Sequence, residues 1–199
     1  EKFTKKKKKL VLLGMLAPLL VACSSEDAAV EEFSNEVTEG LHQSYDIQSE
    51  DLVGTWKLVS MKSKDVPVNL DLNETESKDI LAETDCFENM FFTFDIDGRV
   101  ITQQARLYFE TQSGAMACDA GTYNALYRVN GNILTVDFNV KGGSFSETRT
   151  IDVYEVNNEE FLQVDLTYAE AVGYISKPDF VSPTGATSVC AISMLYKKE

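Results

Sequence analysis

The stretch TYNALYRVNGNILTVDFNV, residues 122–140, decides the fold. It holds two apolar runs, residues 122–129 and 133–140, on either side of Asn130-Gly131. Alternation of apolar and polar residues puts the apolar side chains on one face of a strand, and Asn-Gly between two strands is a strong hairpin signal. The stretch therefore predicts an antiparallel hairpin with one buried face. In its second run the alternating residues are Leu134, Val136, Phe138 and Val140 against Thr135, Asp137 and Asn139.

The same pattern continues on both sides of this hairpin and predicts an all-β fold of eight strands with one short helix at residues 76–83. Further tight turns, such as Asp97-Gly98 and Asn157-Asn158, join the strands into an antiparallel meander. Strands with one apolar face need a covered inner face, which eight of them obtain by closing into an up-and-down barrel; a two-sheet sandwich is the alternative. The expected strands are residues 52–61, 90–96, 99–105 with a possible extension to 110, 122–129, 133–140, 148–156, 160–168 and 189–197.

Two segments interrupt this meander, residues 109–121 and 169–188. Both are expected to be long loops without regular structure. Loops of this length in a compact domain are often functional, for example as a lid over a site, and a plain surface loop is the alternative.

The first 23 residues have the three parts of an export signal. Residues 5–9 are all lysine, residues 10–20 are largely apolar, and Leu20-Val21-Ala22-Cys23 places a small residue before a cysteine. The apolar run is too short for a membrane span, which needs about 20 apolar residues. The last four residues resemble the lipobox of bacterial lipoproteins. The resemblance implies cleavage before Cys23, diacylglycerol on its sulfur and a further acyl chain such as palmitate on the new amine, which together anchor the chain stably. An ordinary secretory signal is the alternative.

The predicted organisation is a signal peptide at residues 1–22, a lipidated flexible tether at 23–45 and a barrel domain at 46–199. Ser24-Ser25-Glu26-Asp27 resembles the surface-export signals of Bacteroidota lipoproteins. We therefore expect the chain at the outer membrane of a bacterial envelope, on its periplasmic or its outer face.

Charge excludes one class of partner. Residues 1–22 hold six of the 18 basic and one of the 32 acidic residues, which leaves residues 23–199 with a net charge of −19. So acidic a chain repels nucleic acid and anionic lipid headgroups. The expected partners are the membrane through the anchor on Cys23, a small amphiphilic ligand and an envelope protein, but no nucleic acid.

The first expected strand carries a family resemblance. Leu52-Val53-Gly54-Thr55-Trp56-Lys57-Leu58 resembles the Gly-x-Trp opening strand of lipocalins, and more closely that of the lipocalin-like domains of Bacteroidota lipoproteins. The resemblance implies that Trp56 plugs the closed end of the barrel beside Gly54. It also implies an arginine near the last strand that packs on this tryptophan. No arginine stands there in this sequence, and Lys197 and Lys198 are the nearest basic residues.

Later segments look like the same family, and the resemblance spans roughly residues 50–197. Cys86 precedes an aromatic strand and a hairpin turn, and Cys118 precedes Gly121-Thr122-Tyr123. Members of the family form a barrel that holds a small, often apolar, molecule. Eight-stranded barrels are either filled by side chains or hold one ligand, so the resemblance alone does not establish a cavity.

The cysteines besides Cys23 are Cys86, Cys118 and Cys190, and any two of them could form a disulfide, which allows three pairings. An oxidising envelope permits a disulfide. We favour Cys86–Cys118, which would tie the predicted helix to the first long loop and contribute roughly 3–4 kcal/mol. Cys190 lies in a predicted strand and is most simply a buried apolar residue.

The residue types that catalysis needs are scarce. His42 is the only histidine of the sequence and lies in the tether, which argues against a Ser-His-Asp, Cys-His or multi-histidine zinc site. Asp95-Ile96-Asp97-Gly98 begins like a calcium loop but lacks the later acidic ligands, so a hairpin turn explains it better. We expect neither enzyme activity nor a metal or cofactor.

Aromatic and basic residues are the candidates for ligand contacts. Tyr108, Tyr123 and Tyr127 can line a pocket or fill the core. Arg106 and Arg128 stand out in an acidic chain; facing inward, either would bind an anionic group such as a carboxylate, and facing outward it would pair with surface acids. The expected function is binding or carriage of a small amphiphilic molecule at the envelope. The alternative is a filled barrel that acts through its outer surface, as an interaction or inhibitor subunit of an envelope assembly.

Overall fold

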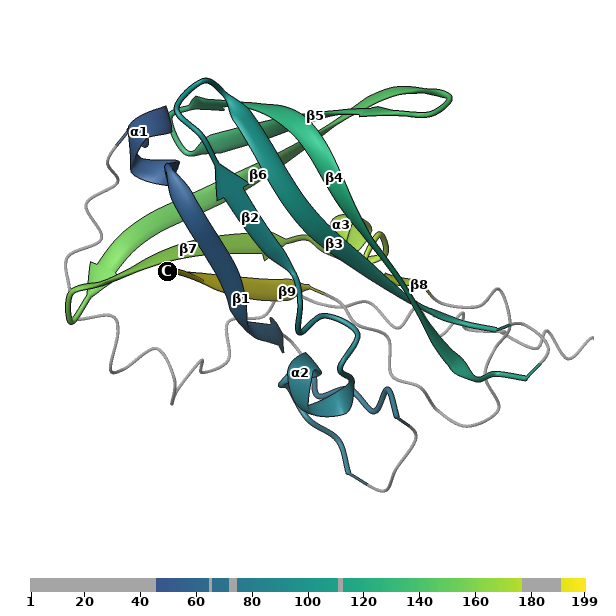
Figure 1. Ribbon diagram of the computed structural model, residues 1–199. Helices are drawn as coiled ribbons and strands as arrows, with labels where there is room; N and C mark the ends of the chain where they lie inside the picture. Colours follow the sequence, from purple (N-terminus) through teal and green to yellow (C-terminus); the bar gives the residue numbers. More distant parts are fainter. Residues whose placement is uncertain (1–45, 65, 72–74, 111–112, 177–190) are drawn as a thin grey trace, which may run out of the picture.

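The computed structural model describes residues 46–64, 66–71, 75–110, 113–176 and 191–199. The predicted signal peptide and tether, with Cys23 and His42, lie outside the described residues, as do Cys190 and the second half of the loop predicted at 169–188. The described part holds nine strands and three short helices (Figure 1). In chain order they are α1 (Ser49–Leu52), β1 (Gly54–Ser63), α2 (Ile80–Glu83), β2 (Phe91–Phe94), β3 (Arg99–Phe109), β4 (Met116–Asn130), β5 (Ile133–Val140), β6 (Gly143–Val156), β7 (Glu159–Leu166), α3 (Tyr168–Ala171), β8 (Ile175–Ser176) and β9 (Ile192–Lys198).

Eight of the nine described strands close into one antiparallel barrel. From β1 to β7 each strand pairs with the next one in the chain, β7 pairs with β9, and β9 returns to β1. Because β1 pairs with β2 on one side and with β9 on the other, the sheet has no free edge there. The predicted up-and-down barrel is confirmed, and the two-sheet sandwich is excluded.

The hairpin of β4 and β5 follows the sequence pattern closely. β5 has the predicted bounds, Ile133–Val140, and the side chains of Leu134, Val136 and Phe138 are buried inside the barrel. Gly131 takes a φ of +60° in the turn, a conformation that glycine adopts at little cost. Phe138 lies opposite Ala125 on one side and Phe145 on the other, so the apolar residues of three strands share the inner face.

The long loop predicted at residues 109–121 is not observed, because most of its described residues belong to a hairpin of β3 and β4. β3 continues to Phe109, β4 begins at Met116, and these two residues lie opposite each other. The prediction was wrong because residues 116–120 have no apolar–polar alternation and are mostly exposed. Strand pairing here rests on the backbone ladder, which needs no buried face.

The predicted helix at residues 76–83 is shorter than expected. Ser77 forms a bridge with Val68, which keeps the chain extended until Asp79. The Asp79 side chain then caps α2, because its Oδ1 accepts a hydrogen bond from the backbone N–H of Leu81 at 3.1 Å. The short helices α1 and α3 were not expected.

α1 closes the end of the barrel at which β1 begins (Figure 1). Leu52 is fully buried, and its carbonyl oxygen accepts a hydrogen bond from Trp56 Nε1 at 2.6 Å. Trp56 is also fully buried. Tyr127 Oη donates to the carbonyl oxygen of Asp95 at 2.7 Å and lies 3.4 Å from that of Ser49 at the start of α1. Trp56 therefore lies at the closed end, as the lipocalin resemblance implies. The hairpin of β5 and β6 projects from the opposite, open end (Figure 1).

The disulfide between Cys86 and Cys118 is present, as predicted. It ties the segment between α2 and β2 to β4, which is the longest of the described strands. No helix in the described ranges is long and apolar enough to cross a bilayer.

Candidate ligand site at the open end of the barrel

A small cavity lies inside the barrel, between its middle and its open end. Its volume is about 20 Å³, which is room for one water molecule and far below the roughly 300–1,000 Å³ of a typical ligand pocket. Six strands and the segment before β8 form its wall. The residues that line it are Phe92, Gln104, Leu134, Val136, Phe138, Glu147, Arg149, Val164, Tyr174, Met194 and Tyr196.

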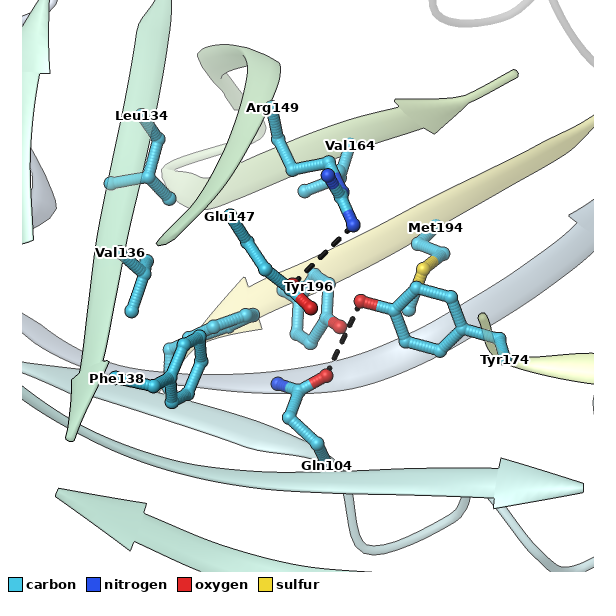
Figure 2. Close-up of a pocket in the computed structure, with 11 residues that line it drawn as sticks. Gln104, Leu134, Val136, Phe138, Glu147, Arg149, Val164, Tyr174, Met194 and Tyr196 are labelled. Atoms are coloured by element: carbon cyan, nitrogen blue, oxygen red, sulfur yellow. Dashed lines mark hydrogen bonds and ion pairs between the residues drawn. The ribbon is translucent and has the colours of Figure 1, made fainter. Parts of the chain in front are cut away.

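Polar groups gather on one side of this apolar wall. Figure 2 shows the Glu147 carboxylate, the Gln104 amide and the hydroxyl groups of Tyr174 and Tyr196 turned toward one another. Tyr174 Oη donates to Gln104 Oε1 at 3.3 Å, and Arg149 Nη2 donates to Glu147 Oε2 at 3.4 Å. The first contact joins β3 to the segment before β8, which is far away in the sequence, and the second lies within β6.

Arg149 is the central cation of this group. Its Nη1 donates to the carbonyl oxygen of Thr148 at 2.9 Å and to Glu170 Oε1 at 3.5 Å. Its Nε is buried and has no hydrogen-bond partner among the described residues. A buried donor without an acceptor is unfavourable, so a water or a ligand oxygen is expected to meet it.

The two tyrosines keep their protons at neutral pH. Burial raises the pKa of Tyr174 to about 12; the nearby Glu147 carboxylate adds to the rise, and the Arg149 guanidinium opposes it. Burial also raises the pKa of Tyr196 well above its usual value. Both hydroxyl groups are therefore neutral and can donate or accept hydrogen bonds.

Three aromatic rings continue the inner wall from the cavity to the open end, and we call Tyr123, Phe138 and Phe145 the aromatic row. The rings of Tyr123 and Phe138 meet edge to face with centroids 5.9 Å apart, and those of Phe138 and Phe145 stack at 4.8 Å. Phe138 is buried, whereas Tyr123 and Phe145 are 37% and 47% exposed. The row therefore presents apolar surface to whatever enters the barrel mouth.

Gly121 makes room for the first ring of the row. A Cβ on Gly121 would lie 2.7 Å from Tyr123 Oη, closer than any side chain permits. The absence of a side chain at Gly121 thus lets the Tyr123 ring lie back along β4 on the inner face.

Of the five residues predicted to contact a ligand, Tyr123 lies beside the cavity. Arg106 and Tyr108 follow Gln104 along β3 toward the hairpin end, are exposed and do not line the cavity; Arg106 Nε donates to Ser176 Oγ at 2.7 Å. Tyr127 is buried at the closed end, and Arg128 is exposed and pairs with Asp137.

The sequence patterns did not point to Arg149, Glu147, Gln104 or Tyr174 as site residues. The sequence does contain a signal for Glu147 and Arg149, because they occupy alternate positions of β6 between the inward-facing Phe145 and Ile151. The predicted strand began only at Thr148, so this alternation was not recognised. Among the residues that the structure describes, no group of three or more His, Cys, Asp or Glu side chains is arranged to hold a metal ion.

Comparison with known families agrees with this architecture. A model of the lipocalin-like domain matches residues 52–162, which is more than half of the chain and runs from α1 into β7. No curated protein matches the chain. The extent of the family match, together with the closed barrel around Trp56, shows that the chain belongs to the lipocalin-like domain family.

Proposed function

We propose that this chain is an envelope lipoprotein whose barrel binds or carries a small amphiphilic molecule through its open end. The observation that carries the proposal is the aromatic row, which leads from solvent to a cavity with polar groups on one side. An apolar wall with few polar groups suits a ligand that has an apolar body and one polar end. Family membership supports it, because a lipocalin-like barrel suggests the binding of a small hydrophobic molecule. The proposed role is binding, without catalysis and without a cofactor.

The cavity must widen before it can admit such a ligand. At about 20 Å³ it holds one water, so side chains at the mouth have to rotate outward. Phe145 is 47% exposed and the Glu147 side chain is 42% exposed, so few packing contacts hold either of them in place. Rotation of exposed side chains is fast and requires no change in the strands.

The proposed anchor is an acyl-modified Cys23, followed by the acidic tether at residues 23–45. The lipobox-like residues 20–23 and the lysines before them support it. Metabolic labelling with an alkyne-bearing palmitate, followed by click detection, tests the anchor. We expect the wild-type chain to be labelled and the Cys23→Ala variant to remain unlabelled. Equal labelling of both would contradict the proposal.

The small cavity also favours a second candidate, a filled barrel that acts through its outer surface as an interaction or inhibitor subunit. Ile101 and Leu126 are large apolar residues exposed on outer faces of β3 and β4, where a partner protein can bury them. This candidate needs no small ligand at all.

Native mass spectrometry of the full chain, released from the envelope of its own host, separates the two candidates. Carriage predicts a reproducible extra mass that leaves on denaturation and whose value identifies the ligand. A bare protein mass, with no thermal stabilisation by a panel of lipids and bile-salt-like amphiphiles, would contradict carriage and favour the outer-surface candidate.

A further inference from the structure

One buried donor lacks an acceptor in the polar cluster, by which we mean the polar side chains that line the cavity: Gln104, Glu147, Arg149, Tyr174 and Tyr196. Tyr174 Oη donates to Gln104, the Gln104 amide donates to Thr102 Oγ1 at 2.6 Å, and Thr102 Oγ1 donates to the Phe91 carbonyl oxygen at 2.8 Å. This series of hydrogen bonds ends at a backbone carbonyl oxygen and needs no ligand to complete it. Arg149 Nε is different, because it is buried and without an acceptor among the described residues. The cluster therefore lacks one hydrogen-bond acceptor.

The charge around Arg149 is already more than balanced. Its guanidinium lies between two carboxylates, Glu147 at 3.4 Å and Glu170 at 3.5 Å. Glu170 is held in place because it also accepts hydrogen bonds from the backbone N–H and the hydroxyl of Thr167, at 2.8 and 2.7 Å. Tyr174 and Tyr196 are protonated and add no charge. The cluster thus carries one net negative charge at neutral pH.

The second arginine of the open end does not change this balance. Arg106 lies opposite Asp119 in the pairing of β3 with β4, so a carboxylate accompanies it. A ligand carboxylate at Arg149 would add a second net negative charge in a partly buried place. An ammonium group would bring only donors, and Arg149 Nε needs an acceptor.

We infer that the open end selects amphiphiles whose polar end is an uncharged oxygen, such as an alcohol or an ester carbonyl, over those that end in a carboxylate. The inference rests on the proposed binding function and names the ligand class. The ligand oxygen accepts from Arg149 Nε in the cavity, and the apolar body lies along the aromatic row. The cavity, at about 20 Å³, accommodates one oxygen-sized group.

A matched series of amphiphiles tests this selectivity. The probes are decan-1-ol, decanoic acid and decylamine, which share one apolar chain, and the protein is the full chain with Cys23→Ala, so that no attached lipid competes. Affinities are measured by displacement of a fluorescent apolar probe and by calorimetry at neutral pH. We expect decan-1-ol to bind roughly tenfold more tightly than decanoic acid, a difference of about 1.4 kcal/mol.

Glu147→Gln is the diagnostic variant, because it removes one of the two carboxylates beside Arg149. The Glu147 side chain is 42% exposed, so the folded barrel tolerates the change. The variant should tighten the binding of decanoic acid several-fold more than it changes that of decan-1-ol. Asp152→Asn removes the same charge from an exposed position on β6 that does not line the cavity, and it should change neither affinity. The comparison separates a local contact from the net charge of the protein.

The outcomes keep the inference apart from the function on which it rests. If the Cys23→Ala chain without further changes binds decanoic acid or decylamine as tightly as decan-1-ol, the binding function stands and the selectivity is overturned. An equal effect of Glu147→Gln and Asp152→Asn on decanoic acid also overturns it. If none of the three amphiphiles binds, the proposed function itself is contradicted, and the inference with it.

Discussion

Lys198 Nζ lies 5.1 Å from the centroid of the Trp56 ring, and this contact explains the Gly-x-Trp motif of β1. The stem of Lys198 passes over Gly54, where an added Cβ would lie 3.0 Å from Lys198 Cε. Gly54 thus leaves space for the lysine that covers the tryptophan, and Lys198 fills the place that an arginine takes in the lipocalin resemblance. Residues of the first and the last described strand, β1 and β9, together complete the closed end of the barrel.

Replacement of this lysine should cost more stability than replacement of its neighbour. Lys198→Ala loses the cation–π contact, the packing of the stem and an ion pair with Glu160, whereas Lys197→Ala loses only an exposed ion pair with Glu159. We expect a difference of about 1 kcal/mol in the free energy of unfolding, measured by urea denaturation. Equal losses in the two variants would show that the Trp56 contact contributes nothing.

Gly54 should be less replaceable than a glycine with similar backbone geometry in open space. Gly54→Ala combines a φ of +130° with crowding by Lys198, whereas Gly142→Ala has a φ of +115° and no atom within 4 Å of the added Cβ. Backbone strain of this kind costs about 1–3 kcal/mol, and only Gly54→Ala adds crowding to it. The melting temperature of Gly54→Ala, measured by thermal denaturation, should therefore be well below that of Gly142→Ala. A smaller loss for Gly54→Ala in the Lys198→Ala background would confirm the source of the crowding.

Prediction from the sequence succeeds where side-chain alternation is complete. β5 was predicted to the residue, because Leu134, Val136 and Phe138 alternate without interruption between two clear turns. It fails where the inner face is polar: Glu147 and Arg149 occupy inward positions on β6 and hide the beginning of that strand. Polar residues at inner positions break the pattern on which strand prediction depends.

Contacts between distant segments account for the rest of what the sequence did not reveal. Tyr174 was expected in a long loop, yet its hydroxyl reaches Gln104, which is 70 residues away in the chain. The same loop prediction hid the short strand β8, which pairs with β3. Neither local propensity nor periodicity contains the geometry that closes such a contact. The candidate site could therefore be recognised only in the folded barrel.

Stability at alkaline pH should depend on Tyr174. Its pKa is raised from 10 to about 12 in the folded chain, so the folded state holds the proton more tightly than the unfolded state does. The resulting stabilisation is complete below pH 10 and is lost as the pH rises toward 12. Tyr174→Phe should flatten this decline, measured as the free energy of unfolding between pH 9 and 12. Identical slopes for the variant and the wild type would contradict the burial of this hydroxyl.

Phe145, the most exposed ring of the aromatic row, should contribute to binding and little to stability. Phe145→Ser removes a half-exposed ring from the inner face and should weaken the binding of decan-1-ol roughly three- to tenfold. Leu126→Ser is the control, because Leu126 is 57% exposed on β4 next to the inward-facing Ala125 and Tyr127, and so faces outward. Both variants should unfold within about 0.5 kcal/mol of the wild type. Loss of affinity in Leu126→Ser instead would place the ligand on the outer surface.

Nuclear magnetic resonance of the full Cys23→Ala chain during titration with decan-1-ol tests most directly the claim that a ligand enters at the open end. The side-chain N–H signals of Arg149 and Trp56 report on the two ends of the barrel, because Arg149 lines the cavity and Trp56 lies against α1. We expect a saturable shift of the Arg149 Nε–H signal, together with the signals of the aromatic row, while the Trp56 indole signal stays in place. A titration that leaves Arg149 unmoved, or that shifts only outward-facing residues such as Leu126, would contradict it.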